Sequence, residues 1–212
     1  MICVSLSEKD FEKCLEWSKE FELSEIRIDL LGFDKNQLEK IFSSGAKLIA
    51  TCRPDNNVND VVRAELLKTA ILAGASYVDI EFESSYAFKQ DIISLAFDKE
   101  CEVIISYHNY KSTPSRDQLK IIVEQCFGMG AHIAKIACMV KKPEDNAKIL
   151  SLYEPGKRIV SIGMGELGRI SRIAAPFLGA EFTFASLNDE LATAPGQINN
   201  EDMKKIMKLL NK

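Results

Sequence analysis

A single lysine, Lys135, interrupts the apolar, strand-like run AHIAKIACM. Placing a lysine in such a run is costly unless the charge is paired or the amine is used in its neutral form. A partly desolvated amine, with its pKa lowered from about 10.4 toward about 7–8, is a nucleophile that can form an imine with a ketone. We therefore predict covalent chemistry at Lys135, although a lysine at the solvent edge of a strand would give the same pattern.

Only two histidines are available for proton transfer. His108 follows the run VIISY, at the exit of an expected strand, and an imidazole can take up and return a proton near neutral pH. His132 lies at the entry of the strand that carries Lys135 and is out of phase with it, so we expect a structural role. His108 is the candidate general acid and base.

Other polar residues come at the ends of strand-like runs. Alternation in SEIRIDLL places Ile26, Ile28 and Leu30 on one face and Glu25, Arg27 and Asp29 on the other, and alternation in YVDIEFE leaves Asp79 and Glu81 inside or at the mouth of a barrel. Any one of these residues could have a purely structural role, such as a helix cap or a solvated surface. Their convergence favours a site. The remaining candidates are Ser5, Arg53 after LIATC, Arg172 in GELGRISR, and the loop Thr193–Gln197.

Short β-rich runs alternate with amphipathic stretches along the whole chain. The predicted strands are Ile2–Leu6, Glu25–Leu31, Lys47–Cys52, Tyr77–Phe82, Glu102–Tyr107, Ile133–Cys138, Arg158–Ile162 and Glu181–Ala185. The predicted helices are Glu8–Phe21, Lys35–Phe42, Asp60–Ala73, Ser85–Phe97, Ser115–Phe127, Pro143–Leu150, Leu167–Phe177 and Asn200–Leu210, with Ser7, Asn59 and Ser115 or Thr113 as start signals and Gly74, Gly130 and Gly179 as stop signals.

Eight such units predict an α/β fold, a (β/α)8 TIM barrel of minimal length that forms one domain over residues 1–212. Side chains then meet at the carboxyl ends of the strands, where barrel enzymes build their sites. The rival is a doubly wound open sheet, which usually has a Gly-rich first turn, whereas Ser5-Leu6-Ser7 contains no GxGxxG.

Composition narrows the class of function. With 46% hydrophobic residues, a net charge of −4 and a pI near 5.4, the chain lacks the clustered cations that nucleic acid or an anionic membrane requires. Six scattered cysteines without a CxxC pair, together with an amino terminus, MICVSLSEKD, that has no leader pattern, favour a reducing cytoplasm. Scattered cysteines and out-of-phase histidines make no zinc ligand set, so we expect no metal.

In combination, EIRID, the arginine after LIATC, YVDIE, ISYHN, AKIACM, GELGRISR and ATAPGQ resemble the type I 3-dehydroquinate dehydratases over essentially the whole chain. The resemblance implies a (β/α)8 barrel, and it implies that 3-dehydroquinate is dehydrated to 3-dehydroshikimate in the shikimate pathway of aromatic amino acid synthesis without a cofactor. It also implies a homodimer. Lys135 matches the imine-forming lysine and His108 the general acid and base. The matched substrate-binding residues are Ser5, Glu25, Arg27, Arg53, Arg172, Thr193 and Gln197; Thr193 stands where many members have serine and keeps a hydroxyl.

The chain departs from that pattern in two places. Many members have a glutamate four residues after the strand 3 arginine that helps orient the histidine; here Asn57 takes its place, with Asp79 or Glu81 as possible substitutes. Many members also carry a hairpin before the first strand, which this sequence lacks, so we expect side chains alone to close the floor of the barrel.

Two other functions fit the same residues. A class I aldolase or transaldolase-like enzyme also places an imine lysine on strand 6, although Gly163-Met164-Gly165 offers only a partial phosphate loop. A barrel that binds a carboxylated metabolite without turning it over would use the arginines but not the amine.

Overall fold

Eight parallel strands alternate with helices in the computed structural model, which describes residues 1–54 and 59–211. The strands are β1 (Ile2–Leu6), β2 (Ser24–Arg27), β3 (Leu48–Thr51), β4 (Tyr77–Glu81), β5 (Glu102–Asn109), β6 (Ile133–Met139), β7 (Ile159–Met164) and β8 (Thr183–Ser186). The helices are α1 (Phe11–Glu20), α2 (Ile28–Leu31), α3 (Lys35–Phe42), α4 (Asp60–Leu72), α5 (Tyr86–Asp98), α6 (Arg116–Gly128), α7 (Glu144–Leu150), the 3-10 turn η1 (Glu166–Gly168), α8 (Arg169–Ala174), the 3-10 turn η2 (Ala175–Leu178) and α9 (Asn200–Leu210).

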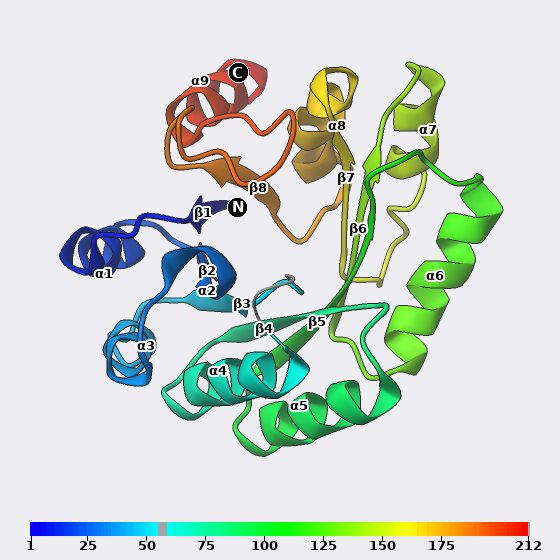
Figure 1. The fold of residues 1–212 in the computed structure, drawn as a ribbon. Helices are drawn as coiled ribbons and strands as arrows, with labels where there is room; N and C mark the ends of the chain where they lie inside the picture. The colour runs from blue at the N-terminus through cyan, green and yellow to red at the C-terminus, as the bar shows by residue number, and fades with distance from the viewer. Residues whose placement is uncertain (55–58, 212) are drawn as a thin grey trace.

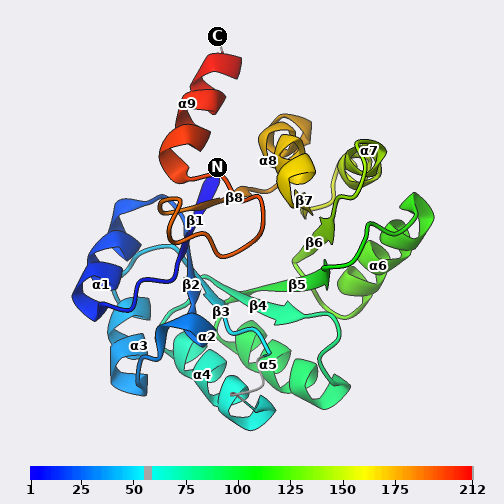
Figure 2. The ribbon, with the colours of Figure 1, turned by 45° about the horizontal axis from the view of Figure 1, so that its top comes forward.

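The strands form a nearly closed barrel with the helices around it (Figure 1). Their order is β7-β6-β5-β4-β3-β2-β1-β8, so the first strand pairs with the last, Ile2 opposite Thr183. Within the described residues no ladder joins β7 to β8; one backbone bond, from Glu181 N to Ile159 O (3.0 Å), links their amino-terminal ends. The predicted (β/α)8 barrel is confirmed, and Figure 2 shows the same ring from a tilted view.

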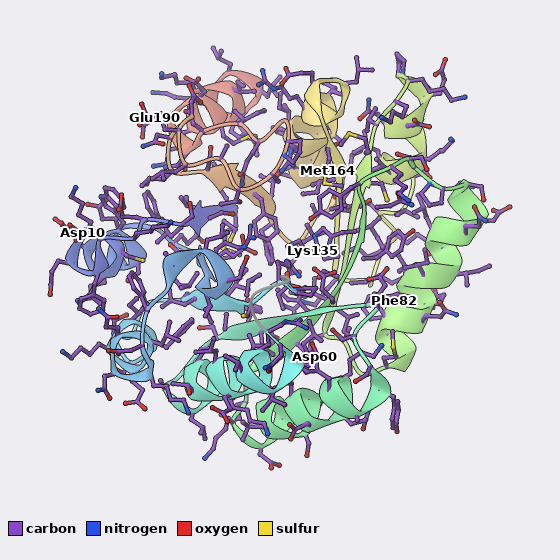
Figure 3. The ribbon with its side chains drawn as sticks, viewed as in Figure 1. Asp10, Asp60, Phe82, Lys135, Met164 and Glu190 are labelled. Atoms are coloured by element: carbon purple, nitrogen blue, oxygen red, sulfur yellow. The ribbon has the colours of Figure 1, made fainter. Side chains whose placement is uncertain are left out.

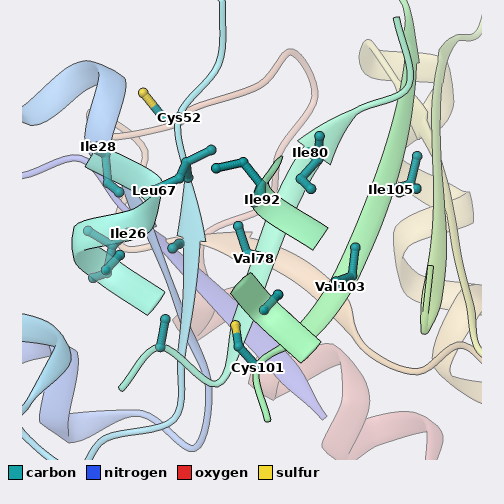
Figure 4. Close-up of a cluster of buried hydrophobic side chains, with 14 of the residues drawn as sticks. Ile26, Ile28, Cys52, Leu67, Val78, Ile80, Ile92, Cys101, Val103 and Ile105 are labelled. Atoms are coloured by element: carbon teal, nitrogen blue, oxygen red, sulfur yellow. The ribbon is translucent and has the colours of Figure 1, made fainter. Parts of the chain in front are cut away.

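Alternation along the strands divides the core into two parts. The outward side chains pack against the helices, for example Val78, Ile80 and Val103 against Leu67 and Ile92 (Figure 4). The inward side chains fill the amino-terminal half of the barrel, where β1 begins at Ile2 and the interior is packed with a separate apolar cluster. That cluster includes Cys3, Leu23, Ile49, Tyr77, Ile104, Ile133, Val160 and Phe182.

The predicted second strand is too long. β2 ends at Arg27, and Ile28–Leu31 form one helical turn that Gly32 ends with a φ of 72°. The alternation of Ile28 and Leu30 fits a strand and a single helical turn equally well, and Leu30 is 40% exposed. Glu25 and Arg27 still share the inward face, because the break comes after them.

Other boundaries differ by smaller amounts. β5 continues through His108 to Asn109, so the histidine lies on the strand rather than after it. α1 begins at Phe11, and its cap is Asp10, whose side chain accepts the N–H of Lys13, rather than Ser7. The caps at Asn59 and Ser115 are confirmed, and no helix among the described residues is long and apolar enough to cross a membrane.

The predicted helix Leu167–Phe177 is divided into η1, α8 and η2. The cause is a close approach between chain segments. A Cβ built on Gly168 would lie 2.5 Å from the carbonyl carbon of Gly163, so the segment can pass over the end of β7 only with glycine at this position.

Candidate active site

Lys135 lies inside the barrel on β6 and is only 4% exposed (Figure 3). Its Nζ is 2.9 Å from Asp79 Oδ2 and 3.7 Å from Glu25 Oε1. On its apolar side the ring of Phe184 lies 4.1 Å away, measured to the centroid. The lysine is therefore sheltered from solvent, with two carboxylates on one side and an aromatic face on the other.

Asp79 and Glu81, both on β4, share one cation. Arg53 donates from Nη2 to Asp79 Oδ2 (2.7 Å) and from Nη1 to Asp79 Oδ1 and Glu81 Oε1 (2.8 Å each). Burial alone would raise the pKa of both carboxyls, but Arg53, with further help from Lys135 at Asp79 and from His108 at Glu81, holds each below its ordinary value. Both groups are therefore carboxylates at neutral pH.

His108 is held by the second of these carboxylates. Its Nδ1 lies 3.0 Å from Glu81 Oε2, and its ring stacks on Tyr110, with centroids 6.0 Å apart. In the register of β5 with β6, Ser106 is opposite Lys135 and His108 opposite Ala137, which places the imidazole on the same inward face, one layer nearer the carboxyl end. Burial and the charge of Arg53 lower the pKa of His108, more than Glu81 raises it.

Glu25 begins a chain of hydrogen bonds that leads to the loop after β8. Its carboxylate accepts from Thr51 Oγ1 (2.9 Å) and from Ser5 Oγ (2.7 Å). Gln197 Nε2 in turn donates to Ser5 Oγ (3.3 Å), and Gln197 Oε1 accepts from Thr193 N (2.8 Å). The pKa of Glu25 lies below its ordinary value, because Lys135 and two arginines outweigh the opposing effect of burial.

Arg27 joins the same loop from the other side. Its Nε and Nη2 donate to the two oxygens of Asp29 (3.1 and 2.7 Å), and Nη1 donates to the carbonyl of Thr193 (3.4 Å). The bidentate pair fixes the plane of the guanidinium and leaves Nη1 toward the pocket and the loop.

Arg172, on α8, is 1% exposed. Within the part of the chain that the structure describes, its Nε and Nη2 have no hydrogen-bond partner. Burial lowers the pKa of the guanidinium from 12.5 to about 10. A buried cation with unused donors at the edge of a pocket suits an anionic ligand.

The nine residues that the family resemblance matched to catalytic and substrate-binding positions all line one pocket of about 480 Å³. They are Ser5, Glu25, Arg27, Arg53, His108, Lys135, Arg172, Thr193 and Gln197. The apolar part of the lining is Ala137, Ile162, Met164, Phe184 and Ala194.

The sequence argument assigned no definite role to three residues of this site. Asp79 and Glu81 were expected inside, but their contacts with Lys135 and His108 depend on strand register. Tyr110, which also lines the pocket, follows the strand in an exposed loop and gave no signal. Asn57 lies outside the described residues.

Cys138 and His132, the remaining groups of chemical interest in the sequence, lie in buried or structural positions. Burial raises the pKa of Cys138 to about 12, so its thiol is protonated at neutral pH. His132 accepts the N–H of Val103 at Nδ1 (2.9 Å) and packs on Phe97, a structural position at the entry of β6. In residues 1–54 and 59–211 no group of three or more His, Cys, Asp or Glu side chains is arranged to hold a metal ion.

Fold and pocket together define a (β/α)8 barrel with its candidate site at the carboxyl ends of the strands, around one buried lysine. The sequence model of the family described as type I 3-dehydroquinase matches residues 2–212. The chain therefore belongs to the type I 3-dehydroquinase family of enzymes.

Individual relatives agree with that assignment. The chain is 34% identical to the 3-dehydroquinate dehydratase of Methanocaldococcus jannaschii, over 100% of this chain and 99% of that protein. It is also 34% identical to the enzyme of the same name from Methanococcus maripaludis, over the full length of both. The crystal structure of the 3-dehydroquinate dehydratase from Aquifex aeolicus superposes with a TM-score of 0.82 at 30% identity, over 100% of this chain and 99% of the other.

Proposed function

We propose that this enzyme dehydrates 3-dehydroquinate to 3-dehydroshikimate through an imine on Lys135, with His108 as general acid and base. The observation that carries the proposal is the environment of Lys135, a buried amine between two carboxylates in the pocket that also holds His108 and Arg172. Family membership supports the reaction, and the geometry supports the assignment of roles.

Substrate binding begins with charge. Each carboxylate of the pocket already has a cationic partner, whereas Arg172 has none among the described residues. The single carboxylate of 3-dehydroquinate would pair with Arg172 by two charge-assisted hydrogen bonds. Arg27 and Glu25 would then contact the ring hydroxyls, with further polar contacts from Ser5, Arg53, Thr193 and Gln197.

The covalent step requires a neutral amine. His108 takes a proton from the Lys135 ammonium, Nζ adds to the C3 carbonyl of the substrate, and His108 returns the proton to the carbinolamine hydroxyl, which leaves as water and gives a protonated imine. His108 removes a proton from C2, the electron pair moves to the iminium nitrogen as an enamine, and the enamine expels the C1 hydroxyl, which leaves as water after His108 protonates it. Hydrolysis of the conjugated iminium then consumes one water and returns the product and the lysine.

The charges around Lys135 suit this sequence. An iminium carries the same single positive charge as the ammonium that it replaces, so Asp79 and Glu25 would stabilise it without rearrangement. The ring of Phe184 would cover its apolar side.

The orientation of His108 also supports the assignment. If Nδ1–H donates to Glu81 Oε2, the lone pair of Nε2 is free to act as the base. Because burial and Arg53 keep the pKa of the imidazole low, His108 would be neutral at the start of the cycle.

The loop 193–197 would act as a lid. Gly165 N donates to Pro195 O (3.0 Å), and Gln197 reaches Ser5 in the interior, so this loop covers the pocket in the present conformation. A covered pocket keeps bulk water away from the iminium during elimination.

No observation favours an aldolase-like reaction on a phosphorylated sugar. A phosphate loop needs free backbone N–H groups. Here Gly163 N donates to Ser171 Oγ, Gly165 N to Pro195 O and Gly168 N to Gly165 O, so these donors are occupied.

The test is to trap the imine. The protein is mixed with 3-dehydroquinate and reduced with borohydride, and peptide mass spectrometry should find the adduct on Lys135, with turnover followed by the ultraviolet absorbance of the enone product. Lys135→Met should abolish both adduct and turnover. A Lys135→Met variant with near-normal turnover would overturn the proposal, as would a wild-type protein that binds the substrate without forming an adduct.

The chain offers a matched control for that experiment. Lys89 is also buried, at 9% exposure, and donates to Phe82 O (2.7 Å) outside the pocket. Lys89→Met should therefore keep the adduct and the turnover of the wild-type enzyme.

The wider setting follows from the same proposal. A 3-dehydroquinate dehydratase of this family would serve the shikimate pathway in the cytoplasm, and the family resemblance supports a homodimer. Light scattering of the purified protein tests the oligomeric state.

A further inference from the structure

Arg53 is placed between the two groups to which the proposed function gives the chemistry. Its guanidinium holds both oxygens of Asp79 and one oxygen of Glu81, and Nη1 also lies 2.8 Å from Ser106 Oγ. Asp79 Oδ1 also accepts from Ser106 Oγ (2.6 Å). The same carboxylates contact the catalytic candidates, Asp79 Oδ2 with Lys135 (2.9 Å) and Glu81 Oε2 with His108 (3.0 Å). Arg53 is thus linked to Lys135 through Asp79 and to His108 through Glu81.

Arg172, which is more deeply buried than Arg53, differs from it. Within the described part of the chain, Arg172 has an Nε and an Nη2 without hydrogen-bond partners and forms no ion pair with a carboxylate. Arg53 has both Nη atoms engaged by protein carboxylates. Geometry therefore separates an arginine suited to bind a substrate anion from one suited to hold the protein's own anions.

We propose that Arg53 is a positioning residue, whose guanidinium clamps Asp79 and Glu81 so that one carboxylate stays beside Lys135 and the other beside His108. The inference rests on the proposed function of those two groups, and it gives Arg53 a role beyond contact with the substrate.

The clamp is needed because of where the two acids lie. Asp79 and Glu81 are 1% and 8% exposed and project from the same face of β4, two residues apart. Two anions so close in a dry interior repel one another. Without Arg53, this repulsion would move the Glu81 carboxylate out of line with Nδ1–H of His108, and the imidazole would be free to turn.

The clamp also acts on the proton affinity of His108. The charged and titratable groups that face this imidazole are Glu81 from β4, Arg53 after β3, Lys135 from β6 and Tyr110 after β5. Arg53 lowers the pKa of His108 and Glu81 raises it. Removing Arg53 should therefore move that pKa upward, and removing the charge of Glu81 should move it downward.

These opposite directions provide the test. In Arg53→Met we expect the acid limb of the kcat/KM profile to move to higher pH by about one unit, and in Glu81→Gln to lower pH by a similar amount. Each variant should lose about 100-fold or more in kcat, while KM stays within about threefold of the wild type. In Arg172→Met, by contrast, the loss of kcat/KM should come mainly from a higher KM.

A direct readout is available because the chain has two histidines. Labelling one imidazole carbon gives one NMR signal for each histidine, and a His108→Asn variant assigns them. The His132 signal is an internal control that the fold is intact. The His108 titration should shift to higher pH in Arg53→Met and to lower pH in Glu81→Gln.

The barrel supplies a matched control arginine at its opposite end. Arg158 also bridges two carboxylates, Glu102 (2.7 and 2.8 Å) and Glu181 (2.7 Å), far from the pocket lining. Arg158→Met should leave kcat, KM and the His108 titration unchanged. If Arg53→Met does not fold, Arg53→Lys replaces it. A lysine keeps the charge but not the bidentate clamp, so kcat should fall below that of the wild type while the His108 titration stays close to wild type.

The results separate this inference from the proposed function. If Arg53→Met raises KM as Arg172→Met does and leaves the His108 titration unmoved, Arg53 only contacts the substrate and the inference is wrong. Shifts of His108 in the same direction in both variants would also overturn it. If wild-type protein forms no borohydride adduct, the proposed function fails, whereas opposite NMR shifts would still establish the clamp.

Discussion

Replacing Arg172 by methionine should stabilise the folded protein and weaken substrate binding at the same time. Arg172 is 1% exposed, with Nε and Nη2 unpartnered within residues 1–54 and 59–211. Methionine keeps most of the aliphatic stem and removes the charge, so the packing of α8 against the barrel should survive.

The size of the expected stabilisation follows from the lowered pKa of Arg172. Burial lowers the pKa of Arg172 from 12.5 to about 10, and each tenfold change in protonation is worth about 1.4 kcal/mol, so keeping the buried guanidinium charged costs about 3 kcal/mol. The unfolded chain binds the proton more tightly than the folded one, and at pH 7 both pKa values are well above the pH, so the full cost is present. Allowing for lost dispersion contacts, Arg172→Met should raise the free energy of unfolding by about 1–3 kcal/mol.

Binding should change in the opposite sense. Removing one partner of a buried charge pair costs about 2–5 kcal/mol of binding free energy, so KM for 3-dehydroquinate should rise at least about 30-fold. Urea unfolding at pH 7 measures the first effect, and steady-state kinetics measure the second. At one fixed concentration, 3-dehydroquinate should stabilise the wild type against urea more than the variant.

A second buried arginine serves as the control. Arg63 is 2% exposed, but its Nε donates to Cys52 O (3.1 Å) and its Nη1 to Asp60 (2.6 Å), and it lies over the ring of Phe88. Arg63→Met removes a donor from the buried carbonyl of Cys52 and the ion pair with Asp60, so it should destabilise the protein by about 1–3 kcal/mol. If Arg172→Met were as destabilising as Arg63→Met, with KM unchanged, the reasoning about an unpartnered cation would be refuted.

Three further outcomes are expected. The lowered pKa of His108 keeps the base neutral at pH 7, so kcat/KM should fall on the acid side only below pH 6.5; a half-maximal point above that value would contradict the assignment. Gly196→Ala places a Cβ 2.2 Å from Gly165 O and should displace the lid and raise KM, whereas Gly32→Ala, with a similar φ of 72° and open space, should only reduce stability; equal kinetics in both variants would rule out the close contact. Iodoacetamide should leave the native protein and its activity unchanged, because Cys138 is buried with a pKa of about 12; rapid alkylation of that thiol in the folded state, measured by mass spectrometry, would show otherwise.

Much of the barrel could be predicted because strand periodicity and helix periodicity differ strongly. β1, α3 and α9 have the predicted bounds, and the polar residues at strand ends meet at one mouth, as parallel strands require. The positions of Lys135 and His108 on the same inward face follow from alternation within their strands.

The errors occur where a few residues fit two structures. Ile28–Leu31 is too short for its apolar spacing to separate a strand from a helical turn, and the positive φ of Gly32 decides the outcome. The division of the segment after β7 depends on Gly168 meeting Gly163, a contact between residues that periodicity does not describe.

Predicting the contacts within the site would have required the register between neighbouring strands, which the sequence alone does not give. In the register of β4, β5 and β6, Glu81 is level with Ser106 and Lys135. The contacts run diagonally to it: Lys135 contacts Asp79, two residues before Glu81, and His108, two residues after Ser106, contacts Glu81. From residue types alone either acid could have been the partner of the histidine.

The pairing of the first strand with the last has a consequence for how the protein is made. β1 is synthesised before the other strands of the barrel, but its neighbour β8 is synthesised after all of them and ends at Ser186. The ring therefore cannot close until translation has passed Ser186, and until then one edge of β1 has no neighbouring strand. A nascent chain that stalls before residue 183 would expose that edge and would be a natural target for chaperones.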